Sequence, residues 1–174
     1  MKIGIISDTH DNVEGFKKAI SIFNEQKVEI VLHCGDWSSL FMLDYCEKLN
    51  CNIISAFGNI DRAFSKLASD PGGKVSFEGQ CVEKNLAGRS LAIYHGVSKP
   101  LLESLIDSGE YDAVFSGHTH IALIREVKNT LHVNPGSAGS PKKNSPSVAV
   151  YETKTNNAEI IYFSGLFWKQ NDES

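Results

Sequence analysis

The chain has 174 residues, of which 41% are apolar and 22% are charged, a composition that is typical of a folded globular protein and argues against disorder. This length predicts a single domain with a core of its own. The 17 lysines and arginines are outnumbered by 21 aspartates and glutamates, and Lys142-Lys143, which we expect in a solvated loop, is the one basic pair of note. An extended nucleic-acid groove is therefore disfavoured, whereas a small phosphate-bearing substrate stays open.

Two further features concern the cellular location. The apolar stretch at the N-terminus is too short for a signal peptide, and no apolar run approaches the roughly 18 residues of a membrane-spanning helix. The four cysteines, at positions 34, 46, 51 and 81, contain no CxxC pair. We therefore expect reduced thiols, a cytoplasmic location and no membrane partner. No residue pattern indicates the oligomeric state, so a homo-oligomer stays open.

The first 61 residues alternate apolar runs with amphipathic segments. Residues 2–7, 28–36 and 51–61 have the apolar character of buried strands. Residues 13–26 carry apolar side chains at helical spacing behind Asn12, which can cap a helix, and residues 38–49 can supply a second helix. Strands joined by crossover helices predict a parallel α/β sheet, in which the functional groups lie at the carboxyl ends of the strands.

From about residue 72 the pattern changes to short strand-like runs. Those at 72–79, 80–88 and 89–96 are separated by turns that contain glycine and predict antiparallel hairpins. We expect a helix at 99–110 and further strands at 111–120, 121–127, 130–133, 147–153 and 157–163. One domain is expected over 1–164. The last residues, 165–174, predict a loosely held tail whose Phe167 and Trp168 either dock on the core or form a contact surface.

Polar side chains follow the apolar runs at the points where strands are expected to end. Two of these motifs, "SDTHDN" and "GHTH", each contain a pair of strong ligands two residues apart. In extended backbone such residues project to the same side, so each pair can aim both side chains into one cleft. Asp61 also follows a strand but receives no ligand role. Seven donors are expected to meet: Asp8, His10, Asp36, Asn59, His95, His118 and His120.

Seven donors exceed the needs of a single ion. One Zn²⁺ ion normally takes four ligands, whereas two ions that share a carboxylate can use the whole set. The mixture of carboxylate, amide and imidazole groups without thiolate disfavours a structural zinc site and suits Mn, Fe, Co or catalytic Zn. We therefore expect two divalent metal ions per chain.

Other polar residues near these motifs are expected to have structural roles. His33 and His132 lie inside apolar strands, where a hydrogen-bonded histidine is the expected reading, although His33 is close enough to Asp36 to support it from behind. The segment "NPGSAGSP" at 134–141 predicts a tight structural loop, with substrate contact through Ser137 as the weaker alternative.

The motifs "SDTHDN", "HCGD", "GNID", "HG", "GHTH" and "NPGSAGSP" together resemble the calcineurin-like metallophosphoesterase superfamily, and in particular its small single-domain prokaryotic phosphodiesterases. The resemblance covers residues 1 to about 153. It implies a four-layer α/β/β/α sandwich of two mixed sheets flanked by helices, with a dinuclear site where the loops of the sheets meet. It also implies that Asp36 bridges two ions, one held by Asp8, His10 and His120 and the other by Asn59, His95 and His118.

The same resemblance implies an activity. It is the hydrolysis of a small phosphodiester by attack of a hydroxide that bridges two divalent ions, with Mn²⁺ favoured and Fe, Zn, Co or Ni as alternatives. The implied catalytic residues are Asp36, Asn59 and His118. Asn59 and Arg62 are expected to contact the substrate, although a solvated surface role for Arg62 is equally open.

Two positions depart from the motifs of the superfamily. Many of its phosphomonoesterases have a histidine after the asparagine of the GN motif, where this chain has Ile60, so the diesterase branch is favoured, or substrates whose leaving group needs little protonation. The H-G-H of the small group is His95-Gly96-Val97 here, so one outer imidazole is absent. Two rival functions stay open. They are a non-catalytic interaction scaffold, which the complete set of histidines disfavours, and a nuclease, which the acidic balance disfavours.

Overall fold

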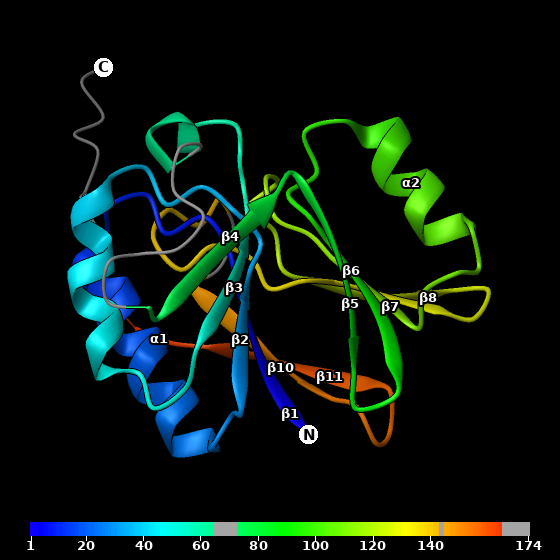
Figure 1. Cartoon of the computed structure of the whole chain (residues 1–174), viewed down its shortest axis with the longest axis horizontal. Helices are drawn as coiled ribbons and strands as arrows, with labels where there is room; N and C mark the ends of the chain where they lie inside the picture. The colour runs from blue at the N-terminus through cyan, green and yellow to red at the C-terminus, as the bar shows by residue number, and fades with distance from the viewer. Residues whose placement is uncertain (65–72, 143–144, 165–174) are drawn as a thin grey trace.

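The computed structural model describes residues 1–64, 73–142 and 145–164. In these ranges the chain forms two β-sheets that pack against each other, with helices on their outer faces (Figure 1). The predicted four-layer α/β/β/α sandwich of two mixed sheets is therefore confirmed. The predicted tail at 165–174, with Phe167 and Trp168, lies outside the described residues.

The first sheet has six strands and is parallel over β1 to β4. Its order is β11-β10-β1-β2-β3-β4, in which β10 pairs antiparallel with β1 and with β11. The three apolar runs of the N-terminal third thus form neighbouring parallel strands, as predicted. The strands span Lys2–Ile6 (β1), Ile30–His33 (β2), Ile53–Ala56 (β3), Val75–Gly79 (β4), Ser147–Glu152 (β10) and Asn157–Tyr162 (β11).

The second sheet has five strands in the order β5-β6-β7-β9-β8. A hairpin of β5 and β6 forms one edge and an antiparallel pair of β8 and β9 forms the other, while β6, β7 and β9 run parallel. The strands span Cys81–Leu86 (β5), Arg89–Tyr94 (β6), Ala113–Phe115 (β7), Leu123–Val127 (β8) and Thr130–Asn134 (β9).

Helices cover the outer faces of both sheets. Helix α1 (Val13–Gln26) begins after Asn12, whose side chain accepts a hydrogen bond from the backbone N–H of Gly15 at 2.9 Å. Figure 1 shows α1 on the outer side of the first sheet and α2 (Lys99–Asp107) on the outer side of the second. Two 3-10 helices, η1 (Leu40–Lys48) and η2 (Asp61–Phe64), follow β2 and β3. None of the helices described meets the length and apolarity that a membrane crossing requires.

Two predicted elements differ in the structure. The segment at 38–49 forms a 3-10 helix, with Met42 and Cys46 as its buried residues, so it packs along a narrow face. The run at 72–79 does not pair in a hairpin: β4 extends the first sheet parallel to β3, because Val75 and Phe77 are buried in the core beneath α1. The predicted hairpin of the two following runs is confirmed as β5 and β6.

Apolar side chains on both faces of β1 hold it between two cores. Ile3 and Ile5 belong to the core between the sheets, where Phe115 of β7 is also buried, whereas Ile6 packs on the α1 side with Phe16. Successive residues of a strand point to opposite faces, so this arrangement follows directly from the sequence of β1. It brings the carboxyl end of β1 beside those of strands from both sheets.

Candidate metal centre

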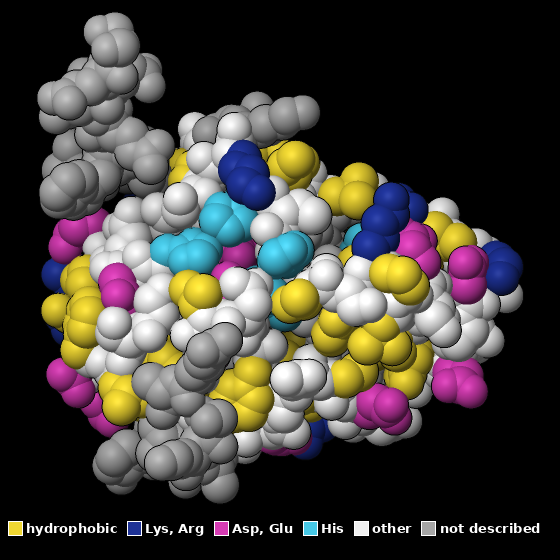
Figure 2. All heavy atoms as spheres, turned by 90° about the horizontal axis from the view of Figure 1, so that it is seen from above, with side chains coloured by type: hydrophobic (Ala, Val, Ile, Leu, Met, Phe, Trp, Pro, Cys, Tyr) yellow, Lys and Arg dark blue, Asp and Glu magenta, His cyan; other side chains and the backbone are white. Residues whose placement is uncertain are grey.

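The seven donors predicted from the sequence all lie just beyond strand ends. Figure 2 shows histidine side chains gathered on one face of the molecule around acidic groups. The strands that lead to them come from both sheets, so the site forms where the loops of the two sheets meet. Asp8 and His10 follow β1, Asp36 follows β2, Asn59 follows β3, His95 follows β6, and His118 and His120 follow β7.

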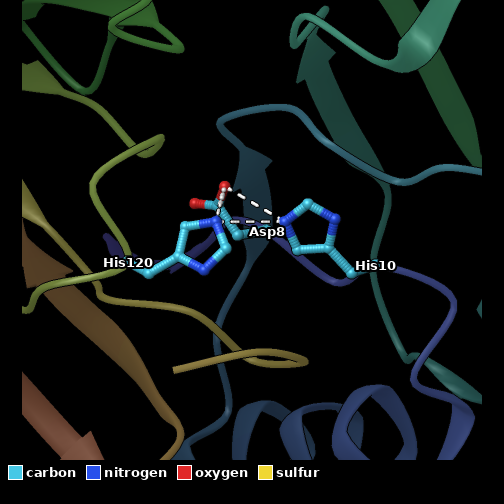
Figure 3. Close-up of side chains that lie close together, drawn as sticks. All are labelled: Asp8, His10 and His120. Carbon is cyan, nitrogen blue, oxygen red and sulfur yellow. Dashed lines mark hydrogen bonds and ion pairs between the residues drawn. The ribbon is translucent and has the colours of Figure 1, made fainter. Parts of the chain in front are cut away.

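One group of donors consists of Asp8, His10 and His120, whose ligand atoms all lie within 4.8 Å of one another. The Oδ1 atom of Asp8 is 3.2 Å from Nε2 of His120 and 3.6 Å from Nε2 of His10. The two Nε2 atoms are 3.1 Å apart (Figure 3). A carboxylate oxygen and two imidazole nitrogens thus point at one small volume.

A second group adjoins the first and shares Asp8 with it. Nε2 of His95 lies 3.2 Å from Oδ2 of Asp36 and 4.0 Å from Oδ1 of Asp8. Asn59 extends this group, because its Oδ1 atom is 3.2 Å from Nε2 of His95 and 3.1 Å from Nδ1 of His118. The structure therefore brings all seven predicted donors into two adjoining groups.

Asp8 Oδ1 lies between the two groups and provides the test of whether a cation fits. It is the buried side-chain oxygen for which the described residues supply no well-formed hydrogen bond. The other oxygen, Oδ2, accepts the backbone N–H of His118 at 3.0 Å. An unpaired buried carboxylate oxygen is unfavourable unless a cation or a donor compensates it. Carboxylate, amide and imidazole donors around this atom suit a divalent metal ion.

The imidazoles keep both carboxylates in the form that binds metals. Burial acts to raise the pKa of Asp8, but the neighbouring imidazoles of His10 and His120 outweigh it and hold that pKa well below its usual range. Burial also acts to raise the pKa of Asp36, where the hydrogen bond with His95 prevails and the pKa is lowered. Metal ligation requires deprotonated carboxylates, and these two are deprotonated at neutral pH. At His95 and His120 burial acts to lower the pKa, but the same carboxylates raise it, so a bound cation would displace protons there.

The backbone at the site is left-handed rather than extended. The φ angles are 55° at Asp8, 46° at His10, 63° at Asp36, 67° at His118 and 59° at His120. The prediction that the two pairs converge was correct, but the extended geometry given as its reason was wrong, because β1 and β7 end before these residues. Left-handed backbone is unfavourable for residues other than glycine and clusters at functional sites.

Two glycines allow the backbone to approach the carboxylates closely. A Cβ atom at Gly117 would lie 1.8 Å from Oγ of Ser7 and 2.7 Å from Oδ2 of Asp8. One at Gly58 would lie 2.0 Å from Oδ1 of Asp36. The glycines that precede His118 and Asn59 are therefore required by the close packing against Asp8 and Asp36.

Backbone carbonyl groups orient two of the imidazoles from behind. Nδ1 of His95 lies 2.8 Å from the carbonyl oxygen of Cys34, and Nδ1 of His120 is hydrogen-bonded to the carbonyl oxygen of Ser140. With Nδ1 engaged in this way, the Nε2 atom of each ring faces the carboxylates. Such hydrogen bonds fix the tautomer and orientation of histidines that bind metals.

Asp61 has a role that sequence reasoning missed. It is buried, and its carboxylate accepts the backbone N–H groups of Asp36 and Trp37 at 2.7 Å and of Gly58 at 2.8 Å. These bonds hold the loops after β2 and β3 together, so Asp61 positions Asp36 and Asn59 without facing the site. The signal was present in the sequence as an acid two residues after Asn59.

The histidines predicted to be structural are satisfied by protein groups. His33 bonds through Nε2 to Oγ1 of Thr9 and accepts the backbone N–H of Gly35 at Nδ1. The same Thr9 hydroxyl reaches the carbonyl oxygen of Asp36, so the predicted support of Asp36 by His33 runs through Thr9. His132 lies away from the donors, in the middle of β9.

Ser137 and Arg62 are the remaining residues with predicted roles. Ser137 is fully buried, and its hydroxyl donates to the carbonyl oxygen of Asp8 at 2.8 Å, which agrees with the structural reading of its loop. Arg62 belongs to η2, but its side chain is not among those that the structure describes. Its contact with substrate stays a prediction.

The order of these motifs and the geometry of the site agree with the comparison with known families. The calcineurin-like phosphoesterase superfamily domain matches residues 1–156 of the chain. The chain belongs to this superfamily. A relative from Methanocaldococcus jannaschii, named phosphodiesterase MJ0936, is 38% identical over 156 residues, which make up 88% of this chain and 94% of the relative.

Solved structures of the superfamily have the same architecture. One, described as a novel archaeal phosphodiesterase, superposes with a TM-score of 0.86 at 38% identity and covers 94% of this chain and 100% of its own. YfcE, a phosphoesterase from E. coli, superposes with a TM-score of 0.67 at 20% identity, covering 88% of this chain and 89% of its own. At that identity the second likeness concerns the fold alone.

Proposed function

We propose that this metallophosphoesterase is a phosphodiesterase that acts on a small phosphodiester with two divalent metal ions. The observation that carries this proposal is the buried Oδ1 atom of Asp8, which lies unpaired between two groups of ligand atoms. A buried carboxylate oxygen without a hydrogen bond destabilises the fold unless a cation or a hydrogen-bond donor compensates its charge. The superfamily membership and the 38% identity to a protein named phosphodiesterase support the same reading.

We assign the ligands as two sets joined by a carboxylate. Asp8, His10 and His120 hold the first ion, and Asn59, His95 and His118 hold the second, with Asp36 between them. The 3.9 Å from Oδ2 of Asp36 to Nε2 of His10 and the 3.2 Å from the same atom to Nε2 of His95 support its central position. Mn²⁺ is favoured among the divalent metals on the resemblance to the superfamily, since carboxylate, amide and imidazole donors without thiolates also suit Fe, Co or catalytic Zn.

The ions, when bound, lower the pKa of a water molecule so that it can act as nucleophile, and they neutralise charge on the phosphoryl oxygens. The side chains of the protein orient the reacting groups. Ile60 donates its backbone N–H to Oδ1 of Asp36 at 3.2 Å, which leaves Oδ2 to face the site. Oδ1 of Asn59 points at His95 and His118, so the amide N–H₂ group is left to contact a phosphate oxygen.

A diester rather than a monoester is favoured by the apolar residues beside the ligands. Ile60 follows Asn59 and is 38% exposed, and Val97 follows His95 by two residues and is 53% exposed. Neither can give a proton to a leaving group. A substrate whose leaving group needs little protonation therefore fits this position, and the second ester group of a diester can rest against the apolar side chains.

The domain and the location of the protein complete the proposal. We infer a single metallophosphoesterase domain over residues 1–164, followed by a tail. A cytoplasmic enzyme agrees with the four free cysteines, Cys34, Cys46, Cys51 and Cys81.

The hydrolysis of bis(p-nitrophenyl) phosphate tests this function. Protein stripped with a chelator is assayed before and after addition of Mn²⁺, beside the monoester p-nitrophenyl phosphate. We expect turnover that requires the metal and favours the diester. Absence of turnover with every divalent ion would overturn the enzyme reading and favour an interaction scaffold, and a preference for the monoester would overturn the diesterase assignment.

A further inference from the structure

The side chain of Asn134, at the end of β9, is buried against the loop that carries His118 and His120. Its Nδ2 atom donates to the carbonyl oxygen of Gly117 at 2.7 Å and to Oγ1 of Thr119 at 3.1 Å. The first acceptor stands directly before His118, and the second stands between the two histidines. One amide group therefore holds the chain on both sides of His118 and directly before His120.

The orientation of this amide is fixed from its other end. The backbone N–H of Gly136 donates to Oδ1 of Asn134 at 2.9 Å, and such a donor can meet only the oxygen of an amide. The Nδ2 atom must then face the histidine loop. An amide has two N–H donors, which equals the number of acceptors that the loop presents. A side chain that only accepts hydrogen bonds, or that makes none, therefore cannot replace Asn134.

The loop that Asn134 holds has an unfavourable backbone conformation. The φ angles of 67° at His118 and 59° at His120 are left-handed, which is unfavourable for residues with a Cβ atom. Between them, the N–H of Thr119 donates at 2.7 Å to the carbonyl oxygen of Gly117, the same oxygen that Asn134 meets. Because such a loop would relax without these contacts, Asn134 stabilises the conformation in which both imidazoles face other ligand atoms.

The two histidines of this loop belong to different groups of the candidate metal centre. Nε2 of His120 lies 3.2 Å from Oδ1 of Asp8, whereas Nδ1 of His118 lies 3.1 Å from Oδ1 of Asn59. In the two ligand sets proposed above, His120 therefore serves the first ion and His118 the second. A side chain that fixes both histidines acts on both ions.

We propose that Asn134 is a positioning residue that couples the two halves of the metal centre, an inference that rests on the proposed two-ion site. It acts on the ions through Gly117 and Thr119 rather than as a ligand. When its contacts are lost, His118 and His120 leave their positions together. The arrangement therefore predicts that one substitution outside the ligand set weakens the binding of both ions.

Ser147 of β10 holds the same segment from the opposite side and provides a matched control. It is 2% exposed, and its hydroxyl donates to the carbonyl oxygen of Pro135 at 2.6 Å. Pro135 directly follows Asn134, so the two side chains make buried hydrogen bonds around one point of the chain. The bond of Ser147 is to the segment after β9, whereas the bonds of Asn134 Nδ2 are to the histidine loop. A purely structural role for Asn134 predicts the same behaviour for variants at both positions.

The test compares Asn134→Leu with Ser147→Ala. Leucine resembles asparagine in shape and adds no charge near the ions, but it has no N–H to donate. Isothermal titration of the metal-free proteins with MnCl₂ should show about tenfold weaker binding of both ions by Asn134→Leu, and wild-type affinity in Ser147→Ala. The Tm of the metal-free protein should fall in both variants, since each loses a buried hydrogen bond.

Thr119→Val is a second variant, which serves if Asn134→Leu does not fold. Thr119 is exposed, so valine, which has the same shape without the hydroxyl, should leave the fold intact. The change removes one of the two acceptors of Asn134 Nδ2, and with it the acceptor of the N–H of Ile121 at 3.3 Å. We expect a smaller loss of Mn²⁺ affinity than in Asn134→Leu, again for both ions.

Equal Mn²⁺ affinity in Asn134→Leu and Ser147→Ala would overturn the role, because Asn134 would then act on stability alone. A loss confined to one ion would also overturn it, as would wild-type affinity in Thr119→Val if Asn134→Leu does not fold. These results refute the role of Asn134 alone when the wild type binds two Mn²⁺ ions and hydrolyses bis(p-nitrophenyl) phosphate. Absence of Mn²⁺ binding by the wild type would refute the metal centre and this role with it.

Discussion

The histidines of this protein occur in two regions with opposite surroundings. His10, His95, His118 and His120 lie beyond the ends of strands, where Nε2 or Nδ1 atoms face carboxylates, an amide oxygen or one another. His33 and His132 lie within strands and bond to protein groups through both ring nitrogens. The same side chain therefore meets other possible metal ligands in one region and structural protein groups in the other.

The two regions also differ in their backbone conformation and in the groups that surround the histidines. At the strand ends, the φ angles of His10, His118 and His120 are positive, and the buried Oδ1 atom of Asp8 lacks a hydrogen bond. Within the strands, the ring of His33 stacks on Trp37 with centroids 3.9 Å apart, and His132 joins Ser116 to Arg125. The strand-end region thus holds unfavourable geometry that a bound cation would compensate, whereas the strand-interior region contributes to folding stability.

The largest effect expected from this contrast is the loss of activity on substitution at the strand ends. Asp36→Asn or His120→Ala should lower kcat for bis(p-nitrophenyl) phosphate by about a thousandfold or more, because each removes a metal ligand. Thermal unfolding without metal should stay close to that of the wild type, since neither residue packs the core. Asp107→Asn, at an exposed carboxylate of α2, is the control, and wild-type activity in either site variant would sink the ligand assignment.

Substitution of a histidine within the strands is expected to lower stability and to leave activity unchanged. His132→Ala should lower the free energy of unfolding by about 2 to 4 kcal/mol, because it opens a cavity and leaves the hydroxyl of Ser116 and Nε of Arg125 without their partner. Activity per folded molecule should not change. Urea unfolding followed by circular dichroism measures the free energy of unfolding. If His132→Ala were as stable as the wild type, His132 would not have the stabilising role that distinguishes it from the strand-end histidines.

A smaller effect is expected on acidification. Burial lowers the pKa of His132 to about 4, and the charge of Arg125 acts in the same direction. Between pH 6.5 and about 4 the unfolded chain then binds a proton that the folded protein does not, so the free energy of unfolding falls as the pH falls. The part of this loss that His132 contributes should reach at most roughly 3 kcal/mol, since its pKa is lowered from 6.5 to about 4, and should level off below that window.

His132→Gln provides the control for this pH dependence, because it keeps a polar side chain that does not titrate. Its free energy of unfolding should change less between pH 6.5 and 4 than that of the wild type. Parallel curves for the two proteins would show that His132 does not contribute to acid sensitivity.

Much of the fold and of the site follows from patterns that are local in the sequence. Apolar runs located β1, β2 and β3, helical spacing located α1, and the polar motifs after the runs located the seven side chains that the structure brings together. These predictions succeed because burial of a strand and the end of a strand are each decided by a few neighbouring residues. The position of β4 was not predictable in this way, since its pairing with β3 depends on a core formed by distant segments.

Other features of the site depend on contacts between loops. The left-handed backbone of Asp8 and His10 is fixed by hydrogen bonds to the carbonyl groups of Gly35 and Asp36, which follow a different strand. The role of Asp61 arises from four loop N–H groups that converge on it. None of these relations is visible in the spacing of residues along the chain.

The location of bound metal tests the central claim most directly. A crystal soaked in MnCl₂ would be measured for the anomalous scattering of manganese. We predict two peaks roughly 3.5 to 4 Å apart, one among Asp8, His10 and His120 and the other among Asn59, His95 and His118, with Asp36 touching both. A single peak would contradict the two-ion centre, and the absence of any peak at these residues would contradict the metal site itself.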